Sequence, residues 1–346
     1  MSNIKLTINQ LGLPRVIIVA FLFLLIITAA IQGQDMSTLA SDVLVRFGMN
    51  GVLSLAMVPA IICGTGLNFG VAVGIIAGLL SGIWSIELGL TGILGVTFAL
   101  VVSVPFSVAF GYLYGKLLNS VKGSEMVVGT YVGYSVISLM CIGWLLLPFK
   151  SPNLVWPIAG TGLRNTITLS GYYEAIFNKF WSFKIFGVTI PTGLILVFAA
   201  FCLIMLIFTR TKVGIAMKAA GSNPMYAKAA GIDVNKMRIL GTVLSTALAA
   251  IGIVVYAQAF GFYQLYNAPL NMAFAPVAAV LLGGASTNHI KISHVVVGTL
   301  LFQALITIAL PVANLVAPEG GLAEVSRLIV SNGIILYALT QSGGRK

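Results

Sequence analysis

The sequence predicts an all-α polytopic membrane protein with about ten transmembrane helices, one of them broken or re-entrant. Hydrophobic residues make up 59% of the 346 residues, and charged residues make up only 8%. The mean hydropathy is +1.05. Soluble domains carry about 25% charged residues, and here long apolar runs recur along the whole chain. Because no soluble segment separates from them, we expect residues 1–346 to form a single membrane domain.

Ten apolar runs define the expected spans, since a helix needs about 20 residues to cross about 30 Å of hydrocarbon. The first run has no convincing small-residue cleavage site after it, which favours an uncleaved helix over a signal peptide. We expect residues 32–47 to form a polar loop. The run at 272–282 is short and contains Pro276, so it is the segment expected to be broken. In chain order the runs are 14–31, 48–63, 71–84, 90–117, 126–147, 191–208, 239–260, 272–282, 294–313 and 323–339.

Small residues within these runs indicate close helix packing. Gly74, Gly78 and Gly82 recur at every fourth position, which lets two helix backbones approach each other. The three cysteines lie singly in separate runs, a spacing that fits neither a metal site nor a disulfide framework. We therefore expect them to be buried apolar side chains, and we expect no metal site.

The distribution of charge predicts the topology. Ten spans place both termini on one side, together with most of the basic segments, and the positive-inside rule makes that side cytoplasmic. The expected location is a bacterial inner membrane. Residues 149–190 are then an extracytoplasmic loop, although they hold four basic residues, namely Lys150, Arg164, Lys179 and Lys184. The pI is basic, at 9.7. In a membrane protein an excess of basic residues reflects the orientation in the membrane, so we expect no nucleic-acid partner.

The segment 210–238 is the one polar interval that is long enough and charged enough to be an interaction surface. It holds six lysine and arginine residues and a single acidic residue, Asp233. Within it we expect a short helix over 224–230. Asn223 is suited to cap its first turn, and Pro224 suits the first helical position. Gly231 suits a left-handed helix end. A helix of about seven residues is not stable alone in water, so it must dock against another surface.

The sequence also limits how transport could be driven. Ion-coupled transporters carry ionisable residues within their spans, whereas all eight acidic residues here lie in loops or at span ends. The chain has no phosphate-binding G-x-x-x-x-G-K-[ST] motif. We expect no catalytic residues and no cofactor in this chain, so the energy for any uphill transport must come from another subunit.

Residues 211–224 (TKVGIAMKAAGSNP) and 229–234 (AAGIDV) resemble the cytoplasmic loop of permease subunits of ABC importers. The closest group handles ribose-like sugars, nucleosides and branched-chain amino acids. Residues 50–56 with 64–70, and residues 278–286, agree with the same family. The resemblance implies a type II ABC importer-like fold and a coupling helix seated in a groove of the ATPase. The residues implied to contact the ATPase are Gly221, Asn223, Pro224, Ala229, Ala230 and Gly231.

The same resemblance implies three protein partners besides membrane lipid. They are ABC ATPase subunits, a second permease forming a homo- or heterodimer, and an extracytoplasmic solute-binding protein. The solute is expected to be small and polar, a simple sugar or nucleoside. Asn68 replaces the aspartate of sugar-type members, and Gly70 replaces a serine. Versions with asparagine resemble branched-chain amino-acid and nucleoside-type permeases more, and branched-chain amino acids are the alternative solute. An ion-coupled secondary transporter and a passive channel are the remaining classes.

Uncharged polar residues within or at the ends of spans are candidates for the translocation path. For each of them, an interhelical hydrogen bond is the alternative role. The candidates are Asn50, Asn68, Gln258 and Gln303.

Overall fold

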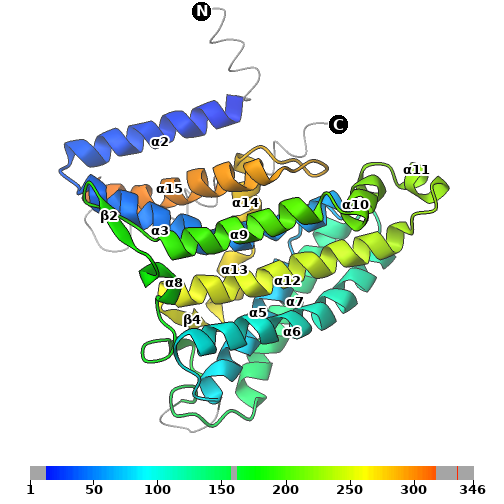
Figure 1. Cartoon of the computed structure of the whole chain (residues 1–346), viewed down its shortest axis with the longest axis horizontal. Coiled ribbons are helices and arrows are strands. Elements are labelled where there is room, and N and C mark those ends of the chain that lie inside the picture. The colour runs from blue at the N-terminus through cyan, green and yellow to red at the C-terminus, as the bar shows by residue number, and fades with distance from the viewer. Residues whose placement is uncertain (1–12, 157–161, 317–332, 334–346) are drawn as a thin grey trace, which may run out of the picture.

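The computed structural model describes residues 13–156, 162–316 and 333, and its described part is built mainly of helices (Figure 1). The longer helices run roughly side by side, and the shorter ones lie near their ends or break a span. Their bounds are α2 Leu13–Ile31, α3 Met36–Leu55, α4 Met57–Ile62, α5 Val71–Glu87, α6 Gly92–Ser120, α7 Glu125–Leu146, α8 Ile176–Lys179, α9 Thr192–Phe208, α10 Lys212–Ser222, α11 Pro224–Ala229, α12 Val234–Phe260, α13 Asn267–Met272, α14 Ala275–Leu282 and α15 Ile292–Val316.

Four short strands add to the all-α class that the sequence predicts. β1, Thr166–Thr168, pairs antiparallel with β4, Phe262–Gln264. β2, Phe183–Ile185, pairs antiparallel with β3, Val188–Ile190. Each strand has three residues, too few for the hydrophobicity pattern to reveal. Three of the four lie in the segment 149–190, where the sequence predicts only a loop.

The described residues form a multi-pass membrane protein. Five helices are long and apolar enough to cross a membrane, or six if α9 and α10, which are bent by 77° relative to each other, count as one span. The helices Val16–Ile31, Val71–Glu87 and Asn267–Leu282 are apolar but shorter. The expected break near Pro276 is present as the two short helices α13 and α14. Apart from Gly333, the expected span 323–339 lies outside the described residues, so a count of ten helices is not confirmed.

The expected polar loop over 32–47 is wrong beyond its first four residues, because α3 begins at Met36. Asp35 caps the helix by accepting hydrogen bonds from the Ser37 amide at 3.0 Å and the Ser37 hydroxyl at 2.7 Å. The Thr38 hydroxyl donates to the same carboxylate. These bonds lower the pKa of Asp35 to about 2, the largest effect being that of the Thr38 hydroxyl. Because this cap starts the helix among polar residues, the polar first half of α3 continues directly into its apolar second half.

The core forms where α12 packs against α3, α5 and α6. The glycine pattern of α5 is confirmed as a device for close packing. A Cβ on Gly74 would lie 2.4 Å from the Thr246 carbonyl oxygen, and one on Gly78 would lie 2.3 Å from the Ala250 carbonyl oxygen. Since neither distance is compatible with a side chain, these glycines let α5 lie directly on the backbone of α12.

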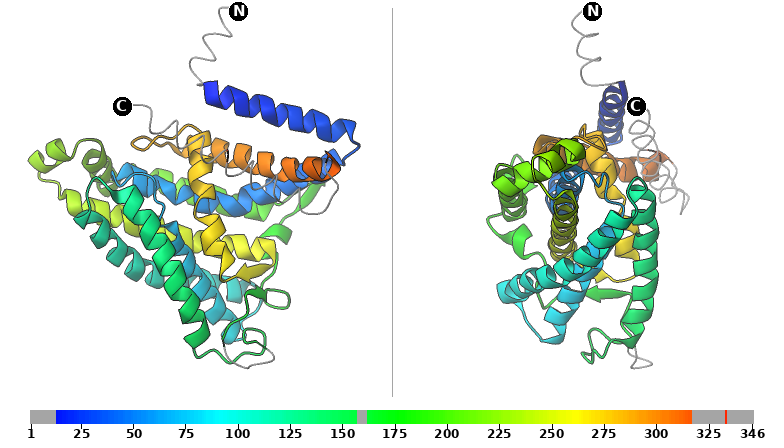
Figure 2. Two further views of the ribbon diagram at one scale, coloured as in Figure 1. Left: turned by 180° about the vertical axis from the view of Figure 1, so that it is seen from behind. Right: turned by 90° about the vertical axis from the view of Figure 1, so that its right-hand side faces the viewer.

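The two ends of the helix bundle differ in character. One end carries α10, α11 and the connections at 63–70 and 120–125, whereas the other carries α8, β2 and β4 (Figure 1). Figure 2 shows the same separation from behind. The basic segment and the long segment 149–190 therefore lie at opposite ends of the long helices.

Candidate functional site

The segment 210–238 is mostly helical, where the sequence predicts one short helix within a loop. α9 ends at Phe208, and α10 follows after a 77° bend. Thr211 caps α10 by accepting a hydrogen bond from the Gly214 amide at 3.2 Å. The sequence analysis missed α10, although Thr211 before a run of good helix formers was an available signal.

α11 has the start and the end that the sequence predicts. The Asn223 side chain accepts a hydrogen bond from the Tyr226 amide at 3.0 Å, and Pro224 occupies the first helical position. At the other end Gly231 has a φ of +78°. Its amide donates to the Lys228 carbonyl, and the Ile232 amide donates to the Ala227 carbonyl. This pair of bonds is the Schellman arrangement that ends many helices.

One side of α11 is buried and the other is exposed. Ala227 is fully buried and packs with Ala220 and Val234 of the neighbouring helices. Ala229, Ala230 and Gly231 are exposed. Met225 and Tyr226 are 83% and 69% exposed, and the sequence analysis did not single them out. Large side chains of these two types are enriched at protein interfaces, which was the signal available.

Gly221 is half-buried against the break after α4, whereas the other residues predicted to contact the ATPase are exposed. A Cβ on Gly221 would lie 2.1 Å from the Ile62 carbonyl oxygen and 2.8 Å from the Gly64 amide nitrogen. The end of α10 is therefore seated directly on the break that follows α4. Only glycine allows the two backbones to come this close.

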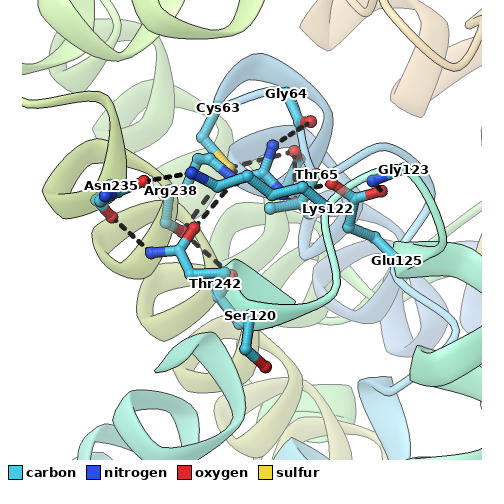
Figure 3. A network of polar contacts seen from close by, with 12 residues as sticks. Cys63, Gly64, Thr65, Ser120, Lys122, Gly123, Glu125, Asn235, Arg238 and Thr242 are labelled. Atoms are coloured by element: carbon cyan, nitrogen blue, oxygen red, sulfur yellow. Dashed lines mark hydrogen bonds and ion pairs between the residues drawn. The ribbon is translucent and has the colours of Figure 1, made fainter. Parts of the chain in front are cut away.

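Arg238, in the first turns of α12, is the centre of a buried polar network (Figure 3). Its guanidinium forms an ion pair with Glu125 and donates to the Asn119 side-chain oxygen at 3.0 Å. It also donates to the Gly64 carbonyl at 3.3 Å. Close by, Asn119 donates to the Asn235 carbonyl at 2.9 Å. One side chain thus joins the start of α12, the break at 64 and the α6–α7 connection.

Sequence reasoning did not find this network. It placed Arg238 in the basic segment 210–238 and counted Glu125 only among the acidic residues in loops or at span ends. The structure directs Lys122 to the Asn235 side chain, at 2.7 Å. The two charged partners are 113 residues apart in the chain, and a local pattern carries no signal for a pair at that separation.

A cavity of about 380 Å³ opens beside Glu125. It is lined by residues 64–66, 123–127 and 287–288, so it adjoins both the break and the turn after α14. The lining mixes backbone of the glycine-rich break with the side chains of Thr65, Ser124 and Asn288. Among the described residues, no three histidine, cysteine or acidic side chains gather closely enough to hold a metal ion.

The four candidates for the path lie on different elements, and among the described residues no hydrogen bond joins any two of them. Asn50 is on α3, where its amide donates to the Arg46 carbonyl at 3.0 Å. Gln303 is a buried residue of α15. Gln258 is fully buried near the end of α12, where it accepts from the Phe177 amide at 3.2 Å.

Asn68 is buried in a network of its own at the break before α5. Its side chain donates to the Ser245 hydroxyl at 2.8 Å and accepts from the Gly70 amide and the Tyr114 hydroxyl, each at 3.0 Å. These bonds tie the break to α6 and α12. They favour the interhelical role that the sequence left open for Asn68. Ser245, the partner of Asn68, and the candidate Gln258 both lie on α12. They are 13 residues apart, which is about 20 Å along a helix.

Comparison with known families identifies the chain. The family described as "Branched-chain amino acid transport system / permease component" matches residues 39–339. The chain belongs to this permease family. The match runs from α3 through all the later described helices, so the α10–α11 unit and the Arg238 network both lie within the permease region.

Curated relatives of this permease transport several kinds of solute, according to their names. The nucleoside ABC transporter permease protein NupB of Lactococcus lactis is 28% identical over 246 residues, covering 68% of this chain and 63% of NupB. The tyrosine transport system permease protein of Clostridioides difficile is 28% identical, covering 65% of this chain and 85% of that protein. The galactofuranose transporter permease protein YtfT of Escherichia coli is 29% identical, and the match covers 57% of this chain and 57% of YtfT. The permease therefore spans less than two thirds of NupB and YtfT. No solved structure matches it.

Proposed function

We propose that the chain is the membrane-spanning subunit of an ATP-driven ABC importer and that α11 docks into its ATPase partner. The observation that carries this proposal is the construction of α11. It is a six-residue helix, capped at both ends, that exposes Met225 and Tyr226 at one end of a membrane permease. A helix this short is held in place by its surroundings. Its exposed side chains fit a partner groove better than open water.

The ATPase contact proposed here consists of Asn223, Pro224, Ala229, Ala230 and Gly231, extended by the two large exposed side chains of α11. Gly221 has a different role, because its contacts are with the backbone of 62–64. It seats the docking unit on the membrane domain. ATP binds to the partner subunit, and this chain holds no cofactor of its own.

The Arg238 network gives α11 a mechanical connection to the membrane domain. α12 begins at Val234, directly after α11 and its cap, and carries Arg238 one turn later. A displacement of α11 would act on the Gly64 carbonyl and on Glu125 through this one side chain. Both groups line or adjoin the 380 Å³ cavity. We place the exit of the solute path at this cavity, and Asn50, Gln258 and Gln303 stay candidates for the path itself.

The orientation follows from the charges at the two ends. The end with α10 and α11 collects basic residues, including Lys116, Lys122, Lys212, Lys218 and Lys228. By the positive-inside rule this end faces the cytoplasm. Both termini are then cytoplasmic in a bacterial inner membrane. The opposite end, which holds 149–190, faces a solute-binding protein, and a second permease completes the membrane unit.

The proposed solute is a nucleoside or a simple sugar, supported by the printed names of NupB and YtfT. Branched-chain amino acids are the second candidate, supported by a relative in Methanocaldococcus jannaschii named as a probable branched-chain amino acid transport permease protein. An ion-coupled secondary transporter is disfavoured, because the acidic residues in the described candidate spans, Asp42 and Glu125, lie within the first two turns of their spans and not in the interior.

The test of the docking proposal is the variant Ala229→Glu, with Ser170→Glu as the matched control. Both positions are exposed, but Ser170 lies near β1 at the opposite end of the molecule. The tagged chain is purified from membranes of its source organism, and the recovered ATPase and ATP-dependent solute uptake are measured. Overpacking costs about 1–3 kcal/mol, and about 1.4 kcal/mol corresponds to tenfold in affinity. Ala229→Glu should weaken ATPase recovery by about tenfold or more, while Ser170→Glu should not. Equal recovery and uptake in both variants would refute docking through α11.

A further inference from the structure

The hairpin formed by β2 and β3 exposes an unusual amount of apolar surface. Residues 180–186, which are β2, the turn residue Phe186 and the three residues before β2, include five large apolar side chains that the described chain leaves 46–101% exposed. They are Phe180 (60% exposed), Trp181 (75%), Phe183 (47%), Ile185 (46%) and Phe186 (101%). Contiguous exposed apolar patches mark interaction surfaces, so this hairpin requires a covering environment.

The turn of this hairpin points to the same conclusion. Phe186 and Gly187 connect the two strands with φ values of +49° and +84°, the type I′ geometry of two-residue hairpin turns. Asparagine, aspartate or glycine is preferred at the first position of such turns. A fully exposed phenylalanine therefore stands where a polar residue would serve the fold better. Its selection is explained if the tip of the hairpin faces an apolar medium.

The position of the hairpin identifies that medium. The hairpin lies along the first turns of α3, where the Thr189 amide donates to the Ser41 hydroxyl at 2.8 Å and Gly187 lies beside Ser37. α2 ends on the same side, because only residues 32–35 separate it from α3 (Figure 1). Ile31, the last residue of α2, is 80% exposed. The hairpin thus lies at the level where the apolar surface of α2 ends, which is the boundary of the hydrocarbon.

The charges of the hairpin fit that boundary too. Lys179 and Lys184 are exposed among the aromatic side chains, and residues 179–190 contain no acidic residue. Tryptophan, here Trp181, is enriched at the head-group level of membranes, and the phenylalanine and isoleucine side chains supply apolar surface that acyl chains can cover. Lysine side chains extend from there toward water and toward anionic head groups.

We infer that the β2–β3 hairpin is an interfacial anchor whose aromatic side chains insert among the lipid head groups and upper acyl chains beside α3. The anchor places part of the segment 149–190 in the membrane, whereas the sequence predicts an aqueous loop. Because Phe180 is also hydrogen-bonded to α9 through the Gly193 amide at 3.0 Å, the anchor would hold the starts of α3 and α9 at a common depth. The inference does not depend on transport or on any protein partner.

The experiment measures tryptophan fluorescence of the full chain in bilayers of phosphatidylcholine brominated near the head-group end of the acyl chains. The contribution of Trp181 is obtained as the difference between the parent and Trp181→Phe, since the chain has four tryptophans. A reference for an aqueous position is Tyr226→Trp in the Trp181→Phe background. That position is 69% exposed on α11, close to the 75% of Trp181. Aqueous acrylamide is the second quencher.

The brominated lipid should remove most of the Trp181 difference emission, and acrylamide should remove little of it. The reference tryptophan should show the opposite pattern. If acrylamide rather than brominated lipid quenches Trp181, the hairpin faces water as a docking surface for a soluble partner, and the inference is wrong. If neither quenches it, a second copy of the chain covers the hairpin, and the inference is also wrong. Unchanged thermal unfolding of Trp181→Phe checks that the variant is folded.

Discussion

Gly221 and Gly64 meet backbone to backbone, so that a Cβ on Gly64 would lie 2.8 Å from the Cα of Gly221. Gly221 ends the basic α10 unit, and Gly64 belongs to the break between α4 and α5. Two stretches that carry the family resemblance, 157 residues apart in the chain, are therefore one contact. We propose that this contact passes motion between the ATPase-facing surface and the membrane domain.

The first prediction concerns this contact. Gly221→Ala would force its Cβ to within 2.1 Å of the Ile62 carbonyl oxygen, so the backbones must separate, at a cost of about 1–3 kcal/mol. We expect a lower midpoint of thermal unfolding and a loss of uptake. Gly231→Ala is the matched control because nothing lies within 4 Å of its Cβ. This variant should lose only the free energy needed to hold an alanine in the left-handed conformation, about 1–2 kcal/mol. The α4–α10 contact should stay intact. A cysteine cross-link between positions 62 and 222 that forms equally in both variants would contradict this prediction.

The second prediction concerns the buried ion pair of Arg238 and Glu125, whose side chains are 10% and 14% exposed. Removing one partner of a buried pair leaves an uncompensated charge and typically costs about 3–5 kcal/mol. Arg238→Met and Glu125→Leu should each lower the unfolding midpoint in detergent. The double variant should recover most of that loss, because an apolar pair replaces the charges. If the network couples α11 to the membrane domain, the stable double variant should still transport poorly. Normal uptake by the double variant would leave the pair a purely structural role.

The third prediction concerns Asn68. Asn68→Ala would leave the Tyr114 hydroxyl and the Ser245 hydroxyl without this partner, and leaving buried polar groups unpaired costs about 1–3 kcal/mol. We expect a loss of stability that is not additive with Ser245→Ala in a double-mutant cycle. Solute affinity should be little changed in protein that remains folded. A change in apparent KM with unchanged stability would instead place Asn68 on the solute path.

The fourth prediction concerns pH at the start of α3. Hydrogen bonds lower the pKa of Asp35 from 3.8 to about 2 in the folded chain. The stabilisation from this cap is therefore fully present above pH 3.8 and is lost as the pH falls toward 2. Hydrogen exchange of the first turn of α3 should not respond to pH through the Asp35 carboxylate above about pH 5. It should accelerate below pH 3.8, after correction for intrinsic exchange. In Asp35→Ala the first turn should exchange rapidly at every pH. Equal protection in the parent and the variant would show that the cap contributes nothing.

The fifth prediction concerns topology. A cysteine at Lys218 on α10 should be hidden from a membrane-impermeant thiol reagent in whole cells, and one at Asn165 should react. Both positions are exposed in the structure. The parent chain is the control, because its cysteines are buried or partly buried. Labelling at 218 without labelling at 165 would invert the proposed orientation.

The sequence alone determined the class of this protein and the local design of α11. The hydrophobic runs indicate a membrane because most of them are about as long as a helix that crosses the hydrocarbon, about 20 residues. The caps of α11 were readable for a different reason: Asn223, Pro224 and Gly231 act on backbone groups within a few residues of themselves. The glycine spacing of α5 was readable too, since a four-residue period marks one helix face.

Only the tertiary structure decided which residues work together. Arg238 reaches Glu125, and Gly221 reaches Gly64, through contacts between segments more than 100 residues apart. No local pattern encodes such pairs, because they depend on how the helices pack. The start of α3 was missed for a related reason: Asp35, Ser37 and Ser41 look like a loop until the cap and the bond to Thr189 are seen. The aromatic hairpin likewise lies in an interval that the sequence predicts as a polar loop, and the proposal that it contacts the membrane rests on its position beside the end of α2.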